Sequence, residues 1–271
     1  MKRTITKIEM EEMKMADKKL SKAVVVSNEM LEEGIYSMWI EEPDIAAVAK
    51  PGQFISLYSK DGSRLLPRPI SICEIEKEAG RLRLVFRVAG VGTAEFAGTK
   101  AGEEIPVLGP LGNGFFEEEP EEAILIGGGI GIPPMLALAK KLSCKKTIVL
   151  GYRDAKNFLA EEFAPYGRVV IATEDGSVGT KGNVIDAMRA EGVTGTMIYA
   201  CGPTPMLRGI ANYAKEEGIQ AQVSLEERMA CGIGACLACV CKSKEKDAHS
   251  HVNNKRVCKD GPVFSIDDIE L

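Results

Sequence analysis

Four cysteines near the carboxyl terminus have the spacing of iron ligands. Cys231, Cys236 and Cys239 follow the pattern Cys-x4-Cys-x2-Cys, and Cys258 comes after 18 further residues. This is the plant-type spacing of a [2Fe–2S] cluster, a one-electron carrier. Most residues between the first two cysteines are small, so backbone N–H groups can turn toward the sulfurs and stabilise the reduced cluster. The tail is therefore predicted to hold a [2Fe–2S] cluster on these four thiolates.

A structural zinc site with four cysteine ligands is the alternative interpretation. Such sites usually pair two short knuckles, whereas here three cysteines share one loop and the fourth stands alone. Disulfides are less favoured still, because clustered cysteines in a reducing compartment more often bind metal. Cys241 is surplus to the four and is predicted to be a free thiol. His249 and His251 are predicted to be solvated loop residues.

Bound cofactors, rather than side chains, are expected to carry the chemistry. The two histidines of the chain both lie in the cysteine-rich tail, so the first 230 residues hold no histidine base. Those residues cannot build a Ser-His-Asp or Cys-His site. We therefore predict no catalytic residue, and we assign the reaction to cofactors.

The composition excludes several partners. The 271 residues include 34 Lys and Arg against 39 Asp and Glu, so the formal charge is −5. Nucleic-acid binding is not expected, because it depends on an excess of positive charge. The longest uncharged run, residues 123–139, is interrupted by glycine and proline, so no membrane span is predicted. The first 20 residues lack the apolar segment of a secretory signal. We expect a cytoplasmic protein.

A glycine-rich turn is predicted to bind a dinucleotide. The sequence GGGIGIPP spans residues 127–134, between an apolar strand and the start of a helix. Glycines there let the dinucleotide approach, and the free N–H groups of the helix face its phosphates. The usual third glycine is absent, and a tight turn without a ligand is the alternative. The predicted contacts are Gly127, Gly128, Gly129 and Gly131.

A second turn supplies the other half of this predicted site. Cys201, Gly202 and Pro203 follow the apolar strand TMIYA, at the sheet edge where open α/β sheets bind ligands. We predict that they contact a nicotinamide; the alternative is that Cys201 is a small core residue. Asp154 ends the strand TIVLGYRD and is predicted to bind the adenosine ribose, which favours NAD. Arg153 beside it would equally suit the 2′-phosphate of NADP.

The sequence RPIS at residues 68–71 is a candidate flavin contact. A guanidinium can bind a pyrophosphate through two hydrogen bonds, and a serine a few residues along the strand can reach a flavin ring. An Arg-Pro pair alone is commonplace, and Gly92-Thr93 also has the alternative of an ordinary turn.

Two kinds of element must position these motifs. Residues 22–118 show six short strands separated by turn signals, which predicts an antiparallel β-barrel. Within it, RLRLVFRV at residues 81–88 alternates apolar residues with arginines, which predicts one apolar and one largely basic face. Strands then alternate with helices, which predicts a parallel sheet covered by helices. The fold class is multidomain β plus α/β, divided into an extension (1–20), a barrel (21–118), a nucleotide-binding domain (119–226) and a cluster module (227–271).

Together the motifs resemble a known family. The combination of RPIS, GGGIGIPP, CGPTPML and the cysteine spacing resembles the ferredoxin-NADP reductase superfamily. Within it, the chain is similar to the electron-transfer subunits of class B dihydroorotate dehydrogenase. The closest matching segments are GPLGNGF (109–115), EERMACGIGACLACVC (226–241) and VCKDGPVF (257–264).

The resemblance implies which residues hold the cofactors. It places NAD(H) against the glycine turn and Cys201, and FAD against the barrel. Related reductases have an aromatic residue where this chain has Ile70, so no aromatic stacking on the flavin is expected from that position. The implied FAD contacts are Arg68, Pro69, Ile70, Ser71, Val85, Phe86, Arg87, Gly92 and Thr93.

The resemblance also implies a pathway and a partner. An FMN-containing catalytic subunit would oxidise dihydroorotate to orotate, a step of pyrimidine biosynthesis, and electrons would pass through the cluster and FAD to NAD+. FAD is the converter, because a flavin exchanges electrons in pairs or singly. The chain has no room for the (β/α)8 barrel of such a partner, so it is expected to be incomplete alone. The resemblance implies a heterotetramer with two of each subunit.

Two other functions remain open at this point. One is a reductase subunit of the same architecture that serves ferredoxin, hydrogenase or sulfite reductase, because the flavin and NAD motifs do not encode the acceptor. The other is a zinc-stabilised NAD-binding regulatory module without redox turnover.

Overall fold

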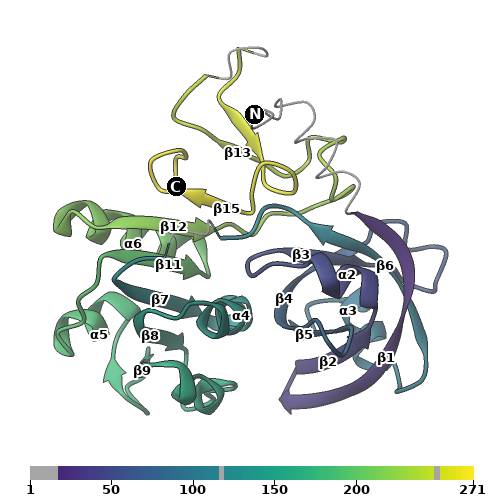
Figure 1. Ribbon diagram of the computed structural model, residues 1–271, viewed down its shortest axis with the longest axis horizontal. Helices are drawn as coiled ribbons and strands as arrows, with labels where there is room; N and C mark the ends of the chain where they lie inside the picture. The colour runs from purple at the N-terminus through teal and green to yellow at the C-terminus, as the bar shows by residue number, and fades with distance from the viewer. Residues whose placement is uncertain (1–17, 116–118, 247–250) are drawn as a thin grey trace, which may run out of the picture.

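The computed structural model describes residues 18–115, 119–246 and 251–271, arranged in three parts (Figure 1). A β-barrel and a layered α/β unit lie side by side, and the carboxyl-terminal segment lies across them. The predictions for residues 1–17 and for His249 fall outside the described residues. Among the described residues, no helix is long and apolar enough to cross a membrane.

The amino-terminal part is the predicted antiparallel barrel. Its strands close in the order β1-β2-β5-β4-β3-β6, and apolar side chains such as Met38, Ile55 and Leu84 fill the interior. Two short helices, α2 (Pro43–Val48) and α3 (Val91–Ala97), connect strands. The strands are β1 (Lys19–Glu32), β2 (Ile35–Glu41), β3 (Phe54–Leu57), β4 (Arg68–Glu76), β5 (Arg81–Arg87) and β6 (Glu104–Leu111).

The second part is built on the predicted parallel sheet. Its strand order is β10-β9-β8-β7-β11-β12-β15, and every pairing up to β12 is parallel. The strands are β7 (Glu122–Gly128), β8 (Lys145–Tyr152), β9 (Arg168–Thr173), β10 (Thr180–Lys181), β11 (Met197–Cys201), β12 (Gln220–Ser224) and β15 (Val263–Ser265). The helices are η1 (Gly129–Gly131), α4 (Pro133–Lys141), η2 (Ala160–Tyr166), α5 (Val184–Ala190) and α6 (Thr204–Glu217).

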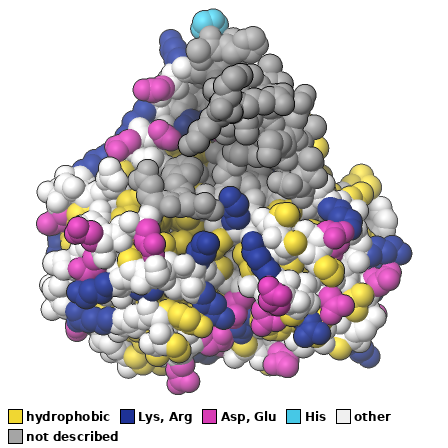
Figure 2. Space-filling view, viewed as in Figure 1, with side chains coloured by type: hydrophobic (Ala, Val, Ile, Leu, Met, Phe, Trp, Pro, Cys, Tyr) yellow, Lys and Arg dark blue, Asp and Glu magenta, His cyan; other side chains and the backbone are white. Residues whose placement is uncertain are grey.

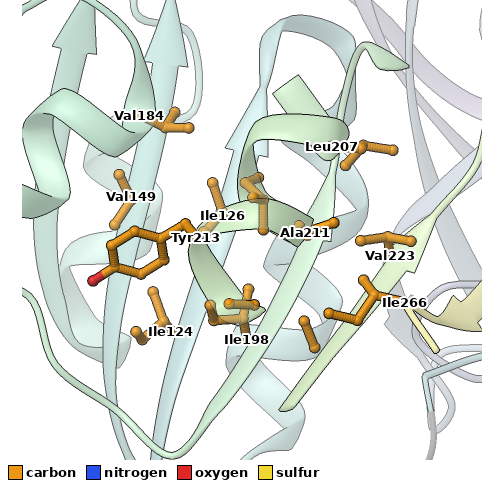
Figure 3. Close-up of a cluster of buried hydrophobic side chains, with 14 of the residues drawn as sticks. Ile124, Ile126, Val149, Val184, Ile198, Leu207, Ala211, Tyr213, Val223 and Ile266 are labelled. Carbon is orange, nitrogen blue, oxygen red and sulfur yellow. The ribbon is translucent and has the colours of Figure 1, made fainter. Parts of the chain in front are cut away.

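The last strand of this sheet comes from the cysteine-rich tail. β15 pairs antiparallel with β12, with Val223 opposite Phe264. Ile266 lies beside Val223 in the apolar layer under α6 (Figure 3). A second pair, β13 (Val240–Lys242) and β14 (Asn254–Arg256), forms a separate two-stranded sheet. The tail therefore shares a hydrophobic core with the α/β unit, which fixes the cysteine loop relative to the sheet.

The predicted basic face of β5 includes one buried arginine. Arg83 is only 8% exposed and lies between the barrel and the α/β unit. It donates hydrogen bonds to Ser37 (2.8 Å), to Glu74 (2.6 Å) and to Glu162 of η2 (3.0 Å). Lys140 of α4 also pairs with Glu74. The arginine thus joins the two parts, because a buried guanidinium requires several acceptors.

Arg83→Ala is expected to destabilise the barrel by about 1 to 3 kcal/mol, because it removes hydrogen bonds from the buried Ser37 hydroxyl and Glu74 carboxylate and leaves Glu74 with Lys140 alone. Trp39, which lies opposite Arg83 on β2, reports barrel unfolding by its fluorescence in urea. The control is Arg81→Ala, whose exposed pair with Glu41 at 3.4 Å is worth less than about 1 kcal/mol. Equal small losses of stability in the two variants would contradict the role of Arg83 in joining the barrel to the α/β unit.

The visible surface carries mixed charge. In the view of Figure 2, Lys and Arg side chains are interspersed with Asp and Glu over both units, so the described residues there form no extended patch of one sign.

Candidate electron-transfer site

The fourth predicted cluster ligand, which is distant in sequence from the other three, is brought back to them in the tail. The antiparallel pairing of β13 with β14 sets Val240 opposite Arg256 and closes the segment between Cys239 and Cys258. The Cys258 N–H then points at Cys239 Sγ, with nitrogen and sulfur 3.4 Å apart. These two cysteines are buried, Cys231 is half-buried and Cys236 is exposed.

Backbone N–H groups gather around the first of these sulfurs. The amides of Ala235 and Cys236 donate to Cys231 Sγ at 3.3 and 3.4 Å. Burial opposes ionisation, yet hydrogen bonds from the amides of Ile233, Cys236 and Ala235 lower the pKa of Cys231 to about 6. The loop is therefore built to hold a thiolate, as the small residues of this segment predict.

The second pair of cysteines requires a cation to ionise together. Burial, and then the neighbouring Cys239 sulfur, raise the pKa of Cys258 to about 12. A metal ion between two such sulfurs reverses this effect, because its charge stabilises both thiolates. Among the described residues, no three His, Cys, Asp or Glu side chains surround one point as ligands of a single ion. Backbone contacts connect Cys236 N–H with Cys231 Sγ and Cys258 N–H with Cys239 Sγ, and a set of four thiolates fits a two-iron cluster.

The cluster loop touches the barrel. A Cβ atom added at Gly232 would lie 3.1 Å from Ser56 Oγ of β3 and 3.2 Å from Leu111 Cδ1 of β6. Gly232 also has a φ of +70°, which favours glycine. The loop that follows Cys231, the first predicted ligand, therefore lies against the barrel.

Two of the predicted flavin segments meet at one place on the barrel. The Arg68 guanidinium lies against Gly92, where an added Cβ would come within 2.7 Å of Arg68 Nε. Arg68 also donates to the carbonyl oxygen of Leu66. This cradle, free of side-chain bulk, suits a pyrophosphate. The Thr93 hydroxyl, by contrast, is engaged with the backbone of Ala89 and Gly90 and caps the helix.

The other predicted flavin residues differ in how far their side chains are exposed. Val85 and Phe86 are 3% and 2% exposed, and the Phe86 ring stacks on Tyr36 in the barrel. They therefore offer backbone groups rather than side chains to a ligand. Arg87 is exposed, and its Nη2 lies 3.9 Å from a Cβ added at Gly129. It reaches from the barrel to the glycine turn. Pro69, Ile70 and Ser71 are half-buried along β4.

The glycine turn and the Cys201 turn, which are predicted to bind NAD(H), lie in close contact. β7 and β11 are neighbours with Gly127 opposite Cys201, at the carboxyl edge of the sheet. A Cβ added at Gly131 would lie 2.4 Å from the carbonyl oxygen of Cys201. Burial raises the pKa of Cys201 to about 12, so its thiol stays protonated. Gly202 and Pro203 lie against Gly128, either directly or through Met206.

Gly131→Ala is expected to raise KM for NADH by about tenfold or more, because it drives the glycine turn away from the Cys201 turn. The FAD content is expected to stay normal, since the substitution lies on the sheet side. Steady-state kinetics with an artificial acceptor measures KM. The control is Gly62→Ala, which meets no atom within 4 Å. An unchanged KM in Gly131→Ala would contradict the assignment of this edge to NADH.

Asp154 lies just after β8 and accepts a hydrogen bond from the backbone N–H of Lys156 at 2.9 Å. It is on the carboxyl side of the sheet, the side of the two turns. A surface cavity lies at the opposite, amino-terminal edge of the sheet, beside Lys146, Tyr166 and Arg168. None of the predicted site residues lines it.

Sequence reasoning missed two residues beside these sites. Arg83 belongs to a regular alternation of apolar residues and arginines, so no signal in the sequence distinguishes it from the other arginines of β5. Ser56 is the polar member of the buried run FISL, and that break in an apolar strand was the available signal.

The fold and the site define a class. A closed antiparallel barrel packed on a parallel sheet, with the glycine turn and the Cys201 turn at one edge of the sheet, is the architecture that this chain shares with a solved ferredoxin-NADP oxidoreductase. A ferredoxin NADP+ reductase from Neisseria gonorrhoeae with bound FAD and NADP shares this fold, with a TM-score of 0.62 and 17% identity over 78% of this chain and 94% of that one. A solved structure of an NADH-dependent reduced ferredoxin-NADP oxidoreductase is more similar, with a TM-score of 0.82 and 31% identity over 92% and 89%.

Sequence relatives narrow the class to a family. Residues 226–270 match the family model for the iron-sulfur cluster binding domain of dihydroorotate dehydrogenase B, and residues 125–212 match the oxidoreductase NAD-binding domain. The dihydroorotate dehydrogenase B (NAD(+)) electron transfer subunit of Fusobacterium nucleatum is 40% identical over 265 residues, covering 93% of this chain and 99% of the relative. That of Bacillus cereus is 42% identical over 257 residues, covering 92% and 97%. The chain belongs to this family of electron transfer subunits.

Proposed function

We propose that the chain transfers electrons between NAD+ and a partner catalytic subunit that oxidises dihydroorotate to orotate, as in the pyrimidine pathway. Its relatives carry that name over nearly their whole length. One structural observation carries the proposal: the cysteine loop, with Gly232 against Ser56, lies on the same barrel that presents the Arg68 cradle. The cluster and the flavin would therefore be neighbours, as electron transfer between them requires.

The cluster ligands in this proposal are Cys231, Cys236, Cys239 and Cys258. The first two sulfurs interact with each other, and so do the last two, which supports two ligands for each iron. Amides of the loop hold Cys231 as a thiolate and stabilise the added negative charge of a reduced cluster.

The barrel residues would hold FAD, which when bound exchanges electron pairs with nicotinamide and single electrons with the cluster. The Arg68 guanidinium binds the pyrophosphate, and the glycine at position 92 leaves room for it. Pro69, Ile70 and Ser71 lie along the same strand, β4. Val85, Phe86 and Arg87 contribute backbone groups and one exposed guanidinium, and Thr93 holds the turn that contains Gly92.

The sheet edge between the turns would receive NAD(H). Gly127, Gly128, Gly129 and Gly131 allow the close approach of the chain on one side, and Cys201, Gly202 and Pro203 form the other side. Asp154 is assigned to the adenosine ribose. Residues 125–212, which match the NAD-binding family model, include all of these positions.

The division of the chain follows these roles. We assign residues 1–20 to an extension, 21–118 to FAD binding, 119–226 to NAD binding and 227–271 to the cluster. β1 begins at Lys19, inside the assigned extension, and β15 of the cluster segment pairs with β12 of the NAD-binding segment.

The partner is proposed to contain FMN and to form a heterotetramer with two copies of each subunit. A cytoplasmic location is also proposed, because thiolate ligands must stay reduced for a cluster to assemble.

Co-purification with cofactor analysis tests the proposal. A tagged chain purified anaerobically from its own cells should retain FAD, two irons with two acid-labile sulfides, and an FMN-containing protein in equal amount. Recovery without any FMN protein would contradict the dihydroorotate assignment, and a colourless protein would contradict electron transfer.

A second candidate function has a specific observation in its favour. The solved NADH-dependent reduced ferredoxin-NADP oxidoreductase chain is 31% identical to this chain. A reductase subunit that serves ferredoxin would use the same flavin and nicotinamide sites. Rapid reduction of ferredoxin by NADH, without stimulation by dihydroorotate, would favour this alternative.

A further inference from the structure

One hydroxyl group on the barrel is buried without a partner. Ser56 of β3 is 1% exposed, and its Oγ has no hydrogen bond to any part of the chain that the structure describes. Buried hydroxyls in native proteins nearly always find a partner, so each exception requires an explanation. A bound group that completes the hydrogen bond is one such explanation.

The direction of the Ser56 side chain follows from its neighbours in the strand. Ile55 and Leu57 belong to the apolar cluster inside the barrel, whereas Phe54 packs into the core shared with the sheet. Successive side chains of a strand point to opposite faces. Ser56 therefore points out of the barrel, on the side of Phe54 and toward the rest of the molecule.

The outer face at Ser56 is covered by the cysteine loop. Gly232, directly after Cys231, lies so close that an added Cβ would be 3.1 Å from Ser56 Oγ. On the strand beside it, Ser56 pairs with Pro69, next to the Arg68 cradle. The unpaired hydroxyl is thus close to the cysteine loop and lies on the strand beside the one that carries Arg68.

We propose that the Ser56 hydroxyl donates a hydrogen bond to a sulfur of the cluster on its Cys231 side, and so raises the reduction potential of the cluster. This inference rests on the proposed function. The loop amides at Ala235 and Cys236 already act on Cys231 in the same sense. Because this donor belongs to the barrel, the reduction potential of the cluster would depend on how the cysteine loop packs against the barrel. Ser56 is then a positioning and tuning residue of the relay.

The test compares the cluster potential of the whole complex with and without this hydroxyl. In Ser56→Ala, the equilibrium constant for cluster reduction is expected to fall about tenfold, which is a shift of about 59 mV to lower potential for one electron. Redox titration followed by electron paramagnetic resonance measures it. In addition, pulsed resonance of the reduced cluster should lose the coupling of one exchangeable proton.

Two controls isolate the hydroxyl. Ser21→Ala removes another buried, unpartnered hydroxyl, from β1, which is not a neighbour of β3 in the barrel, and should leave the cluster potential unchanged. Ser56→Thr and Ser56→Val have the same shape and differ in the hydroxyl. If lost packing rather than the lost hydrogen bond changes the cluster potential in Ser56→Ala, the Thr and Val variants still separate the two effects. Only Ser56→Val should then show the tenfold shift.

An unchanged cluster potential in Ser56→Ala and in Ser56→Val would overturn the inference. A shift in the FAD potential alone would also overturn it, because the hydroxyl would then serve the flavin. These outcomes differ from failure of the proposed function, in which the unsubstituted complex itself would contain no reducible [2Fe–2S] cluster.

Discussion

Cys236→Ser is expected to remove the [2Fe–2S] cluster and, with it, electron transfer between the catalytic subunit and NAD+, while NADH still reduces bound FAD within about twofold of the normal rate. The serine hydroxyl does not ionise at neutral pH and is a poor ligand for iron. Cys236 lies on the exposed side of the loop, so its replacement removes a ligand with little change in packing. Visible absorbance, iron content and stopped-flow reduction by NADH measure the three effects.

Cys241→Ser is the matched control for this variant. Cys241 lies only two residues after Cys239, on β13, and is surplus to the four cysteines of the predicted ligand spacing. Its replacement should keep the cluster and full activity. If Cys236→Ser lost NADH-to-FAD transfer and cluster absorbance equally, the proposed order of the carriers would be wrong.

Arg68→Ala is expected to strip FAD from the protein. Removal of a guanidinium that makes two charge-assisted hydrogen bonds costs about 3 kcal/mol, which corresponds to about a hundredfold weaker binding. The site has no obvious substitute, because the space beside Arg68 is formed by Gly92. Flavin content after gel filtration and a titration of the apoprotein with FAD measure the loss.

Arg68→Lys gives the graded comparison. A lysine keeps the charge but not the planar fork, so an intermediate affinity for FAD is expected. The iron content of both variants should be unchanged, because the cluster ligands come from a different segment. Full flavin content in Arg68→Ala would contradict the pyrophosphate role of this residue.

The fold could be predicted largely because its signals are local. Strand periodicity and turn residues located the six barrel strands, and the change to alternating strands and helices located the parallel sheet. The pairing of β15 with β12 could not be predicted, because three residues, Val263–Ser265, carry no pattern that identifies their neighbour. Long-range pairing depends on the whole packed core, here through Val223 and Ile266.

The candidate site was predictable to different degrees. Cysteine spacing predicts four cluster ligands, and the structure brings Cys258 back to Cys239, as that prediction requires. Side-chain direction is a different matter: Val85 and Phe86 lie in a predicted flavin segment, yet their side chains fill cores. Arg83 belongs to the predicted basic face of β5, and only the contact between the barrel and the α/β unit shows that it is buried.

Ser56 illustrates what a sequence cannot reveal. A serine in a strand is ordinary, and its significance comes from the Gly232 backbone that covers it, 176 positions later in the chain. Both the unpaired hydroxyl and the close approach of the glycine are properties of the folded molecule.

The most direct test of the relay is anaerobic mixing of the purified complex with NADH, followed at the flavin absorbance and, in frozen samples, at the cluster resonance. We expect FAD to be reduced first and the cluster afterwards, with cluster reduction lost when Arg68→Ala removes the flavin. Reduction of the cluster by NADH at a normal rate in the flavin-free protein would contradict the account.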